Sequence, residues 1–194
     1  MTAPAMNPSP CTPPPAASGG EPSWSTADLR RLTPGELERL GQQSLREHLA
    51  AQAAVARELH GPVDATRLPA LLRDPACLRH PVRLVYELGE MAMHQFAHPD
   101  IDWRNTAEEG RVIYLRPALR SRPDLLPLAV AYMIPVVNYG QVVTDAHCLV
   151  YAATLLGLAE EECYRRLCAL ADSLGAEPRP GGCNAVASSV VSLK

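Results

Sequence analysis

The feature that most constrains this chain is an uncharged stretch of twenty residues at positions 125–144, LLPLAVAYMIPVVNYGQVVT, with charged segments on both sides. In a water-soluble protein such a stretch has to be buried, because only burial compensates for the entropy lost when so many apolar side chains are ordered. Asn138 and Gly140 form a turn signal near its end. The stretch therefore predicts a buried helical hairpin that continues to residue 156.

Local signals also mark the ends of several helices. Thr33, Pro34 and Glu36 have the order of an N-cap, a first-turn proline and a capping-box glutamate, which predicts a helix over residues 34–60. Thr144 is the predicted N-cap of the second hairpin helix, and Gly157 its C-terminal stop. Further helices are expected at residues 65–73, 81–97, 124–137 and 160–174. Residues 111–116, RVIYLR, are compatible with either a short strand or the start of another helix.

These elements predict an all-α fold, namely a single compact helical bundle of about five to seven helices around the buried hairpin, over residues 24–175. Residues 1–23 are rich in proline and small polar side chains, and are expected to be a disordered N-terminal tail. The alternative for this tail is an export signal of the kind that type III secretion effectors carry. Residues 176–194 are expected to be a flexible C-terminal tail.

The composition narrows the class of protein. The net charge of −3 and the isoelectric point near 6.1 give no reason to expect a nucleic-acid partner. Basic charge is almost all arginine, Lys194 being the only lysine, which is typical of a GC-rich and therefore bacterial genome. The N-terminus has no basic and apolar segments of a secretory signal, and prolines and amides interrupt the uncharged stretch, so we expect a cytoplasmic protein without a membrane segment.

Two pairs of polar residues are the candidate metal ligands. Glu90 and His94 are one turn apart on the predicted helix at 81–97, and Asp145 and His147 begin the second hairpin helix. If these helices are neighbours, two imidazoles and two carboxylates converge, a set that suits Zn, Fe or Mn in a helical bundle. The alternative is that Glu90 and His94 belong to a solvated face, while Asp145 and His147 stabilise a helix N-terminus.

The cysteines and arginines are weaker indications of a chemical function. None of the six cysteines forms a C-x-x-C pair, and Cys163 lies at helical spacing with Leu167, Leu170 and Leu174, which predicts a buried apolar face. Four arginines near the uncharged stretch suggest either an anion site or a solubilising flank: Arg111, Arg116, Arg120 and Arg122. Phosphate-loop, dinucleotide-binding and nucleophile-elbow motifs are absent from the sequence.

Two functions agree with this sequence. The first is a helical protein that binds another protein, as an accessory or regulatory factor, and it is favoured by the missing catalytic motifs. The second is a small metal-dependent enzyme or metal-binding protein that uses Glu90, His94, Asp145 and His147.

Overall fold

The structure is a computed structural model that describes residues 25–88, 91–92, 95–100 and 110–175. The two predicted tails, 1–23 and 176–194, lie outside the described residues. The chain divides after Arg39 into two units, Met1–Arg39 and Leu40–Lys194. Among the described helices, none is both long enough and apolar enough to cross a bilayer.

The first unit holds the start of the long helix that the sequence predicts. A short helix, α1 (Thr26–Leu29), is capped by Ser25 and precedes α2 (Pro34–His60). The Thr33 backbone N–H donates to the Glu36 carboxylate at 2.8 Å, and the Glu36 N–H donates back to the Thr33 hydroxyl at 3.4 Å. The predicted capping box is therefore confirmed. The Thr33 hydroxyl donates to the same carboxylate at 2.7 Å, and this bond, together with the one from the backbone N–H, lowers the pKa of Glu36.

The second unit contains the predicted helical hairpin. Its arms are α4 (Leu126–Tyr139) and α5 (Asp145–Leu156), joined by a 3-10 turn, η2 (Gly140–Val142). Gly157 ends α5 in the left-handed conformation, with φ 68° and ψ 36°. The last helix, α6 (Glu160–Gly175), begins with three glutamates, where the helix dipole favours negative charge. The hairpin and the last helix are thus confirmed.

The all-α prediction is wrong, because the second unit also contains a three-stranded mixed sheet. The strands are β1 (Val82–Tyr86), β2 (Ala97–Asp100) and β3 (Arg111–Leu115), in the order β1-β3-β2. Val82 pairs with Arg111 in the parallel pair β1–β3, and Ala97 pairs with Leu115 in the antiparallel pair β2–β3. The protein is therefore not a helical bundle, and no helix spans 81–97. The ambiguous segment 111–116 supplies the central strand.

The misassigned segment shows why helical periodicity was misleading. Residues 82–86, VRLVY, contain the β-branched and aromatic side chains that fit a pleated surface, yet they also match the first turns of an amphipathic helix. The choice between the two depends on the pairing with β3. That pairing joins segments far apart in the chain, so it leaves no mark in the local periodicity.

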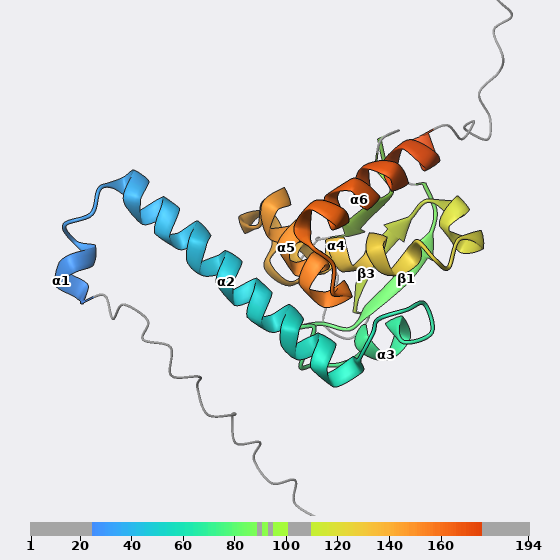
Figure 1. Cartoon of the computed structure of the whole chain (residues 1–194), viewed down its shortest axis with the longest axis horizontal. Coiled ribbons are helices and arrows are strands. Elements are labelled where there is room, and N and C mark those ends of the chain that lie inside the picture. Colours follow the sequence, from blue (N-terminus) through green and yellow to red (C-terminus); the bar gives the residue numbers. More distant parts are fainter. Residues whose placement is uncertain (1–24, 89–90, 93–94, 101–109, 176–194) are drawn as a thin grey trace, which may run out of the picture. The chain divides into compact units, whose positions relative to one another are not determined.

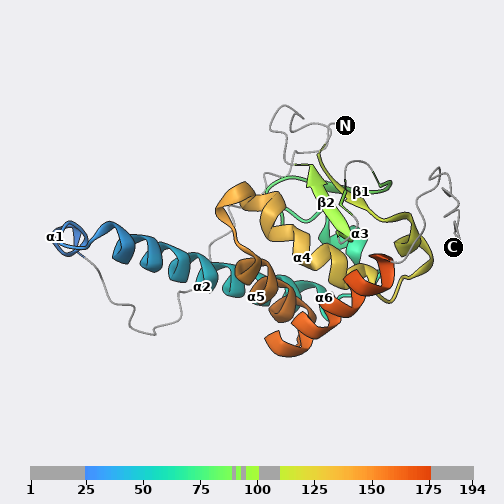
Figure 2. The same ribbon diagram turned by 90° about the horizontal axis from the view of Figure 1, so that it is seen from above.

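The sheet explains why α4 is apolar on every side. α4 lies between the sheet and the pair α5–α6, which pack on its opposite side (Figures 1 and 2). A helix with neighbours on both sides buries most of its circumference, although Tyr132 and Met133 of α4 are only half-buried. Ala129, Val130 and Ile134 are fully buried, and Pro135 is buried in a helix that continues to Tyr139. The uncharged stretch is therefore the middle layer of this unit.

Three hydrogen bonds fasten α2 to the hairpin. The Tyr139 hydroxyl donates to the Gln52 side chain at 2.9 Å and lies 2.7 Å from Nε2 of His48. The His147 ring bonds to the Gln42 carbonyl at 3.0 Å. Between α2 and β1 lies the short helix α3 (Leu68–Leu71), and a 3-10 helix, η1 (Pro117–Ser121), follows β3.

Gly110, at the start of β3, gives a test of the sheet. Its φ is +73°, and a Cβ added there would lie 2.6 Å from the Pro81 carbonyl oxygen, which accepts the Arg111 N–H. Gly110→Ala is expected to lower the free energy of unfolding, measured with urea, by about 2 kcal/mol, because both the backbone strain and the clash with a fixed carbonyl are unavoidable.

Gly157→Ala is the matched control. Gly157 also has a positive φ, of 68°, but an added Cβ would meet only the end of the Arg57 side chain, which can move. Gly157→Ala should therefore lower the free energy of unfolding by only about 1 kcal/mol. Equal losses for the two variants would contradict the close approach of β1 and β3 at Pro81.

Candidate functional site

The structure describes two of the four residues of the predicted metal site. Glu90 and His94 lie outside the described residues, so the convergence of the two predicted pairs stays a prediction. Asp145 and His147 are both described, at the first turn of α5.

His147 is buried and serves as a cap. Its Nδ1 accepts the backbone N–H of Thr144 at 3.0 Å, and its Nε2 lies 3.0 Å from the Gln42 carbonyl oxygen. Since Nδ1 accepts, Nε2 carries the proton and donates to that carbonyl. The side chain is 3% exposed. In this arrangement both ring nitrogens already have partners, and His147 joins α5 to α2.

Asp145 contacts α4 rather than α2. Its carboxylate accepts a hydrogen bond from the Tyr132 hydroxyl at 3.1 Å. Burial raises the pKa of Tyr132, and the Asp145 carboxylate raises it further, so the phenol keeps its proton and remains a donor. Asp145 itself is exposed, so its charge stays accessible from outside.

The Tyr132–Asp145 pair belongs to an open, mainly apolar groove with a volume of about 360 Å³. Three helices and the residue before β2 form it, and Tyr132 meets Phe96 edge-on with ring centroids 5.9 Å apart. The groove is lined by Phe96, Tyr132, Asp145, Ala146, Leu149, Tyr164, Leu167, Cys168 and Ala171. Among these residues Asp145 is the only one with an ionised side chain at neutral pH. Tyr164 is 60% exposed, although it is a large apolar side chain.

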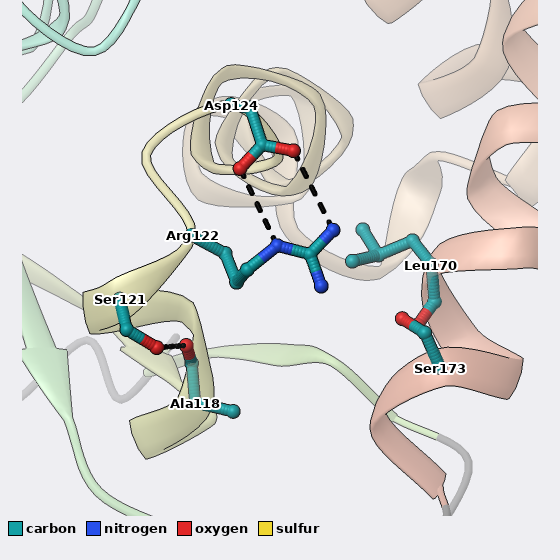
Figure 3. A network of polar contacts seen from close by, with 6 residues as sticks. All are labelled: Ala118, Ser121, Arg122, Asp124, Leu170 and Ser173. Carbon is teal, nitrogen blue, oxygen red and sulfur yellow. Dashed lines mark hydrogen bonds and ion pairs between the residues drawn. The ribbon is translucent and has the colours of Figure 1, made fainter.

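A second cavity, of about 440 Å³, lies between the start of α4 and α6. Arg122 and Asp124 pair with each other at its edge, at 3.4 Å and 3.5 Å, while Leu170 and Ser173 of α6 lie opposite (Figure 3). Arg166, which also lines it, pairs with Glu162 on its own helix. Because each arginine already has an acidic partner, this cavity has less unmatched charge for a ligand than the groove around Asp145.

Of the four arginines near the uncharged stretch, Arg116 and Arg120 contact other parts of the protein. Arg116 is buried, and its guanidinium donates to the carbonyl oxygens of Gln95 and Ala92 at 2.6 and 2.9 Å. The Arg120 guanidinium lies 5.1 Å from the centre of the Tyr86 ring. Arg116 therefore holds the segment before β2, and Arg120 lies against the aromatic ring of β1.

The described cysteines fall into two groups. Cys77, Cys148 and Cys163 are buried, and burial raises the pKa of their thiols to about 11, 12 and 11 respectively. Cys168 is exposed, at the groove. The predicted apolar face of α6, which includes Cys163, is confirmed, since its members are 0–7% exposed.

One cluster was not anticipated from the sequence. His60, at the end of α2, lies beside Asp74 and Cys77 of the loop before β1, and one ligand atom from each lies within 4.8 Å of the others. The spacing of Asp74 and Cys77 places both on one turn, which is a weak signal. Nothing in the sequence connects that turn to His60, because their proximity depends on how α2 ends.

Comparison of the chain with protein-family models, with curated proteins and with solved structures found no match. The class of this protein is therefore described from its own fold and groove. It is a small mixed α/β domain in which three helices frame an open apolar groove with one acidic side chain.

Proposed function

We propose that this protein acts by binding another protein, in an accessory or regulatory role, and that the groove around Asp145 receives an amphipathic helix of the partner. The observation that carries the proposal is the composition of the groove. Apolar side chains from α4, α5 and α6 line it, Tyr164 remains 60% exposed, and a single carboxylate lies at its edge.

The shape of the groove favours a helical segment as the partner. Grooves between helices accept an amphipathic helix through side chains at positions i, i+3 or i+4, and i+7, which enter as apolar anchors. Leu149 and the ring of Tyr164 offer the apolar surface that such anchors would cover, and the buried Leu167 lies beneath them. Exposed apolar area of this kind costs free energy in water, and a partner that covers it recovers that cost.

Charge favours a basic residue on the partner helix. Asp145 is exposed and already accepts the Tyr132 hydroxyl, so its carboxylate is held in one orientation. A lysine or arginine beside the apolar anchors would pair with it, while an acidic residue at that position would be repelled. A groove of this size anchors an interface at the small end of the known range, so the affinity is expected to be micromolar.

The test uses a displayed library of amphipathic helical peptides as the probe. Peptides enriched on the full chain should carry apolar residues at helical spacing and one basic residue. Tyr164→Ser should weaken their binding by about tenfold or more, and Asp145→Asn by a smaller factor, since each removes one anchoring contact. Bound peptide should also slow the alkylation of Cys168, the exposed thiol at the groove.

Two control variants separate the groove from the general surface. Val142→Ser removes another exposed apolar side chain, 66% exposed, and Asp124→Asn another exposed carboxylate, both outside the groove. Neither should change peptide binding. If the library yields no peptides of this pattern, or if the control variants weaken binding as much as the groove variants, the proposal is wrong.

A further inference from the structure

We propose that His60, Asp74 and Cys77 form a binding site for one Zn²⁺ ion, which fastens the end of α2 to the loop before β1. The inference does not rest on the peptide groove, which uses other residues.

The donor atoms are close enough to share an ion. Nε2 of His60 lies 2.8 Å from Oδ2 of Asp74, and one ligand atom from each of the three side chains lies within 4.8 Å of the others. Tetrahedral zinc, with bonds of about 2.0 Å to nitrogen and oxygen and about 2.3 Å to sulfur, requires ligand atoms roughly 3.3–3.8 Å apart. Side-chain movements of about 1 Å would therefore admit the ion, with a fourth position left for water.

The donor types and their charges suit zinc. Imidazole nitrogen, thiolate sulfur and carboxylate oxygen are the three ligand types that Zn²⁺ takes from proteins. One carboxylate and one thiolate balance its two positive charges. A bound ion therefore leaves no net charge in a partly buried place, where the His60 and Asp74 side chains are 15% and 26% exposed.

The loop holds two of the ligands in place before any ion arrives. Asp74 accepts the Ala76 N–H through Oδ1 at 2.8 Å, and its backbone carbonyl accepts the Cys77 N–H at 3.0 Å. Asn138 of α4 braces the same turn, since it donates to the Cys77 carbonyl at 3.2 Å and accepts the Arg79 N–H at 3.1 Å. Such outer contacts orient the first ligands of metal sites.

The test uses Co²⁺ as a spectroscopic probe with the full chain, freed of metal and kept reduced. One equivalent should produce a thiolate-to-cobalt charge-transfer band in the near ultraviolet and the intense visible bands of tetrahedral cobalt, and Zn²⁺ should displace it. Cys77→Ser should abolish the charge-transfer band, and His60→Gln and Asp74→Asn should each weaken binding about tenfold or more. Cys168→Ser, which changes a thiol elsewhere, should bind like the wild type. Circular dichroism confirms that each variant is folded before it is compared.

Three results would overturn the proposal. The first is cobalt binding without a thiolate band. The second is a band that survives in Cys77→Ser but disappears in Cys11→Ser/Cys183→Ser, which removes the two cysteines outside the described residues. The third is Co²⁺ binding with wild-type affinity by both His60→Gln and Asp74→Asn.

Discussion

Replacing Ile134 with alanine is expected to lower the free energy of unfolding by about 3–5 kcal/mol, the largest effect of any single change considered for this protein. Ile134 is fully buried in α4, the helix that lies between the sheet and the pair α5–α6. Truncation leaves a cavity in the middle layer, and neighbours on both sides limit how far the surrounding side chains can move to fill it. Urea unfolding followed by circular dichroism measures the loss.

Val142→Ala is the control for this prediction. Val142 is 66% exposed in the turn after α4, so its truncation should change the free energy of unfolding by no more than about 0.5 kcal/mol. A loss at Ile134 as small as that at Val142 would mean that α4 is not enclosed on both sides.

His147→Ala is expected to lower the free energy of unfolding by about 3 kcal/mol, because two groups lose their partners at once. The Thr144 N–H loses its acceptor, the Gln42 carbonyl loses its donor, and the contact between α5 and α2 is lost. An exposed histidine at the same helical position would cost far less to remove.

The reciprocal cap gives a sharper version of this test. Thr144→Ala alone should cost about 1 kcal/mol, as for other N-cap residues. In the His147→Ala background the same change should cost less, since the Thr144 hydroxyl and the His147 ring are partners at 3.0 Å. Strict additivity of the two losses would show that the two side chains do not form one cap.

The helices that could be predicted are those whose ends are marked locally. The start of α2 is marked by Thr33 and Glu36, and the two ends of α5 are marked by Thr144 and Gly157. Each of these signals acts through contacts within a few residues of the chain. The composition of the uncharged stretch likewise predicted burial, which holds for most of residues 125–137 but not for the exposed Gln141, Val142 and Thr144. These features depend on neighbours in the chain, so the sequence displays them directly.

The candidate sites were harder to foresee. Asp145 was a candidate from its polar surroundings, but the groove beside it requires side chains from three helices and from the residue before β2. His60, Asp74 and Cys77 were not candidates at all, because no spacing in the chain relates a helix end to a turn that follows it. The role of Asn138, an amide in an apolar stretch, became clear only from its two hydrogen bonds to the 77–79 turn.

Capping residues, turn residues and the uncharged stretch were enough to establish the α4–α5 hairpin and its burial, because each acts over a few positions of the chain. The sheet was settled by pairing at long range: Val82 meets Arg111, and Ala97 meets Leu115, only once the chain has folded. Backbone hydrogen bonds between distant segments outweigh a helical periodicity that either structure would tolerate. For the same reason the groove and the His60–Asp74–Cys77 cluster exist only in the folded molecule.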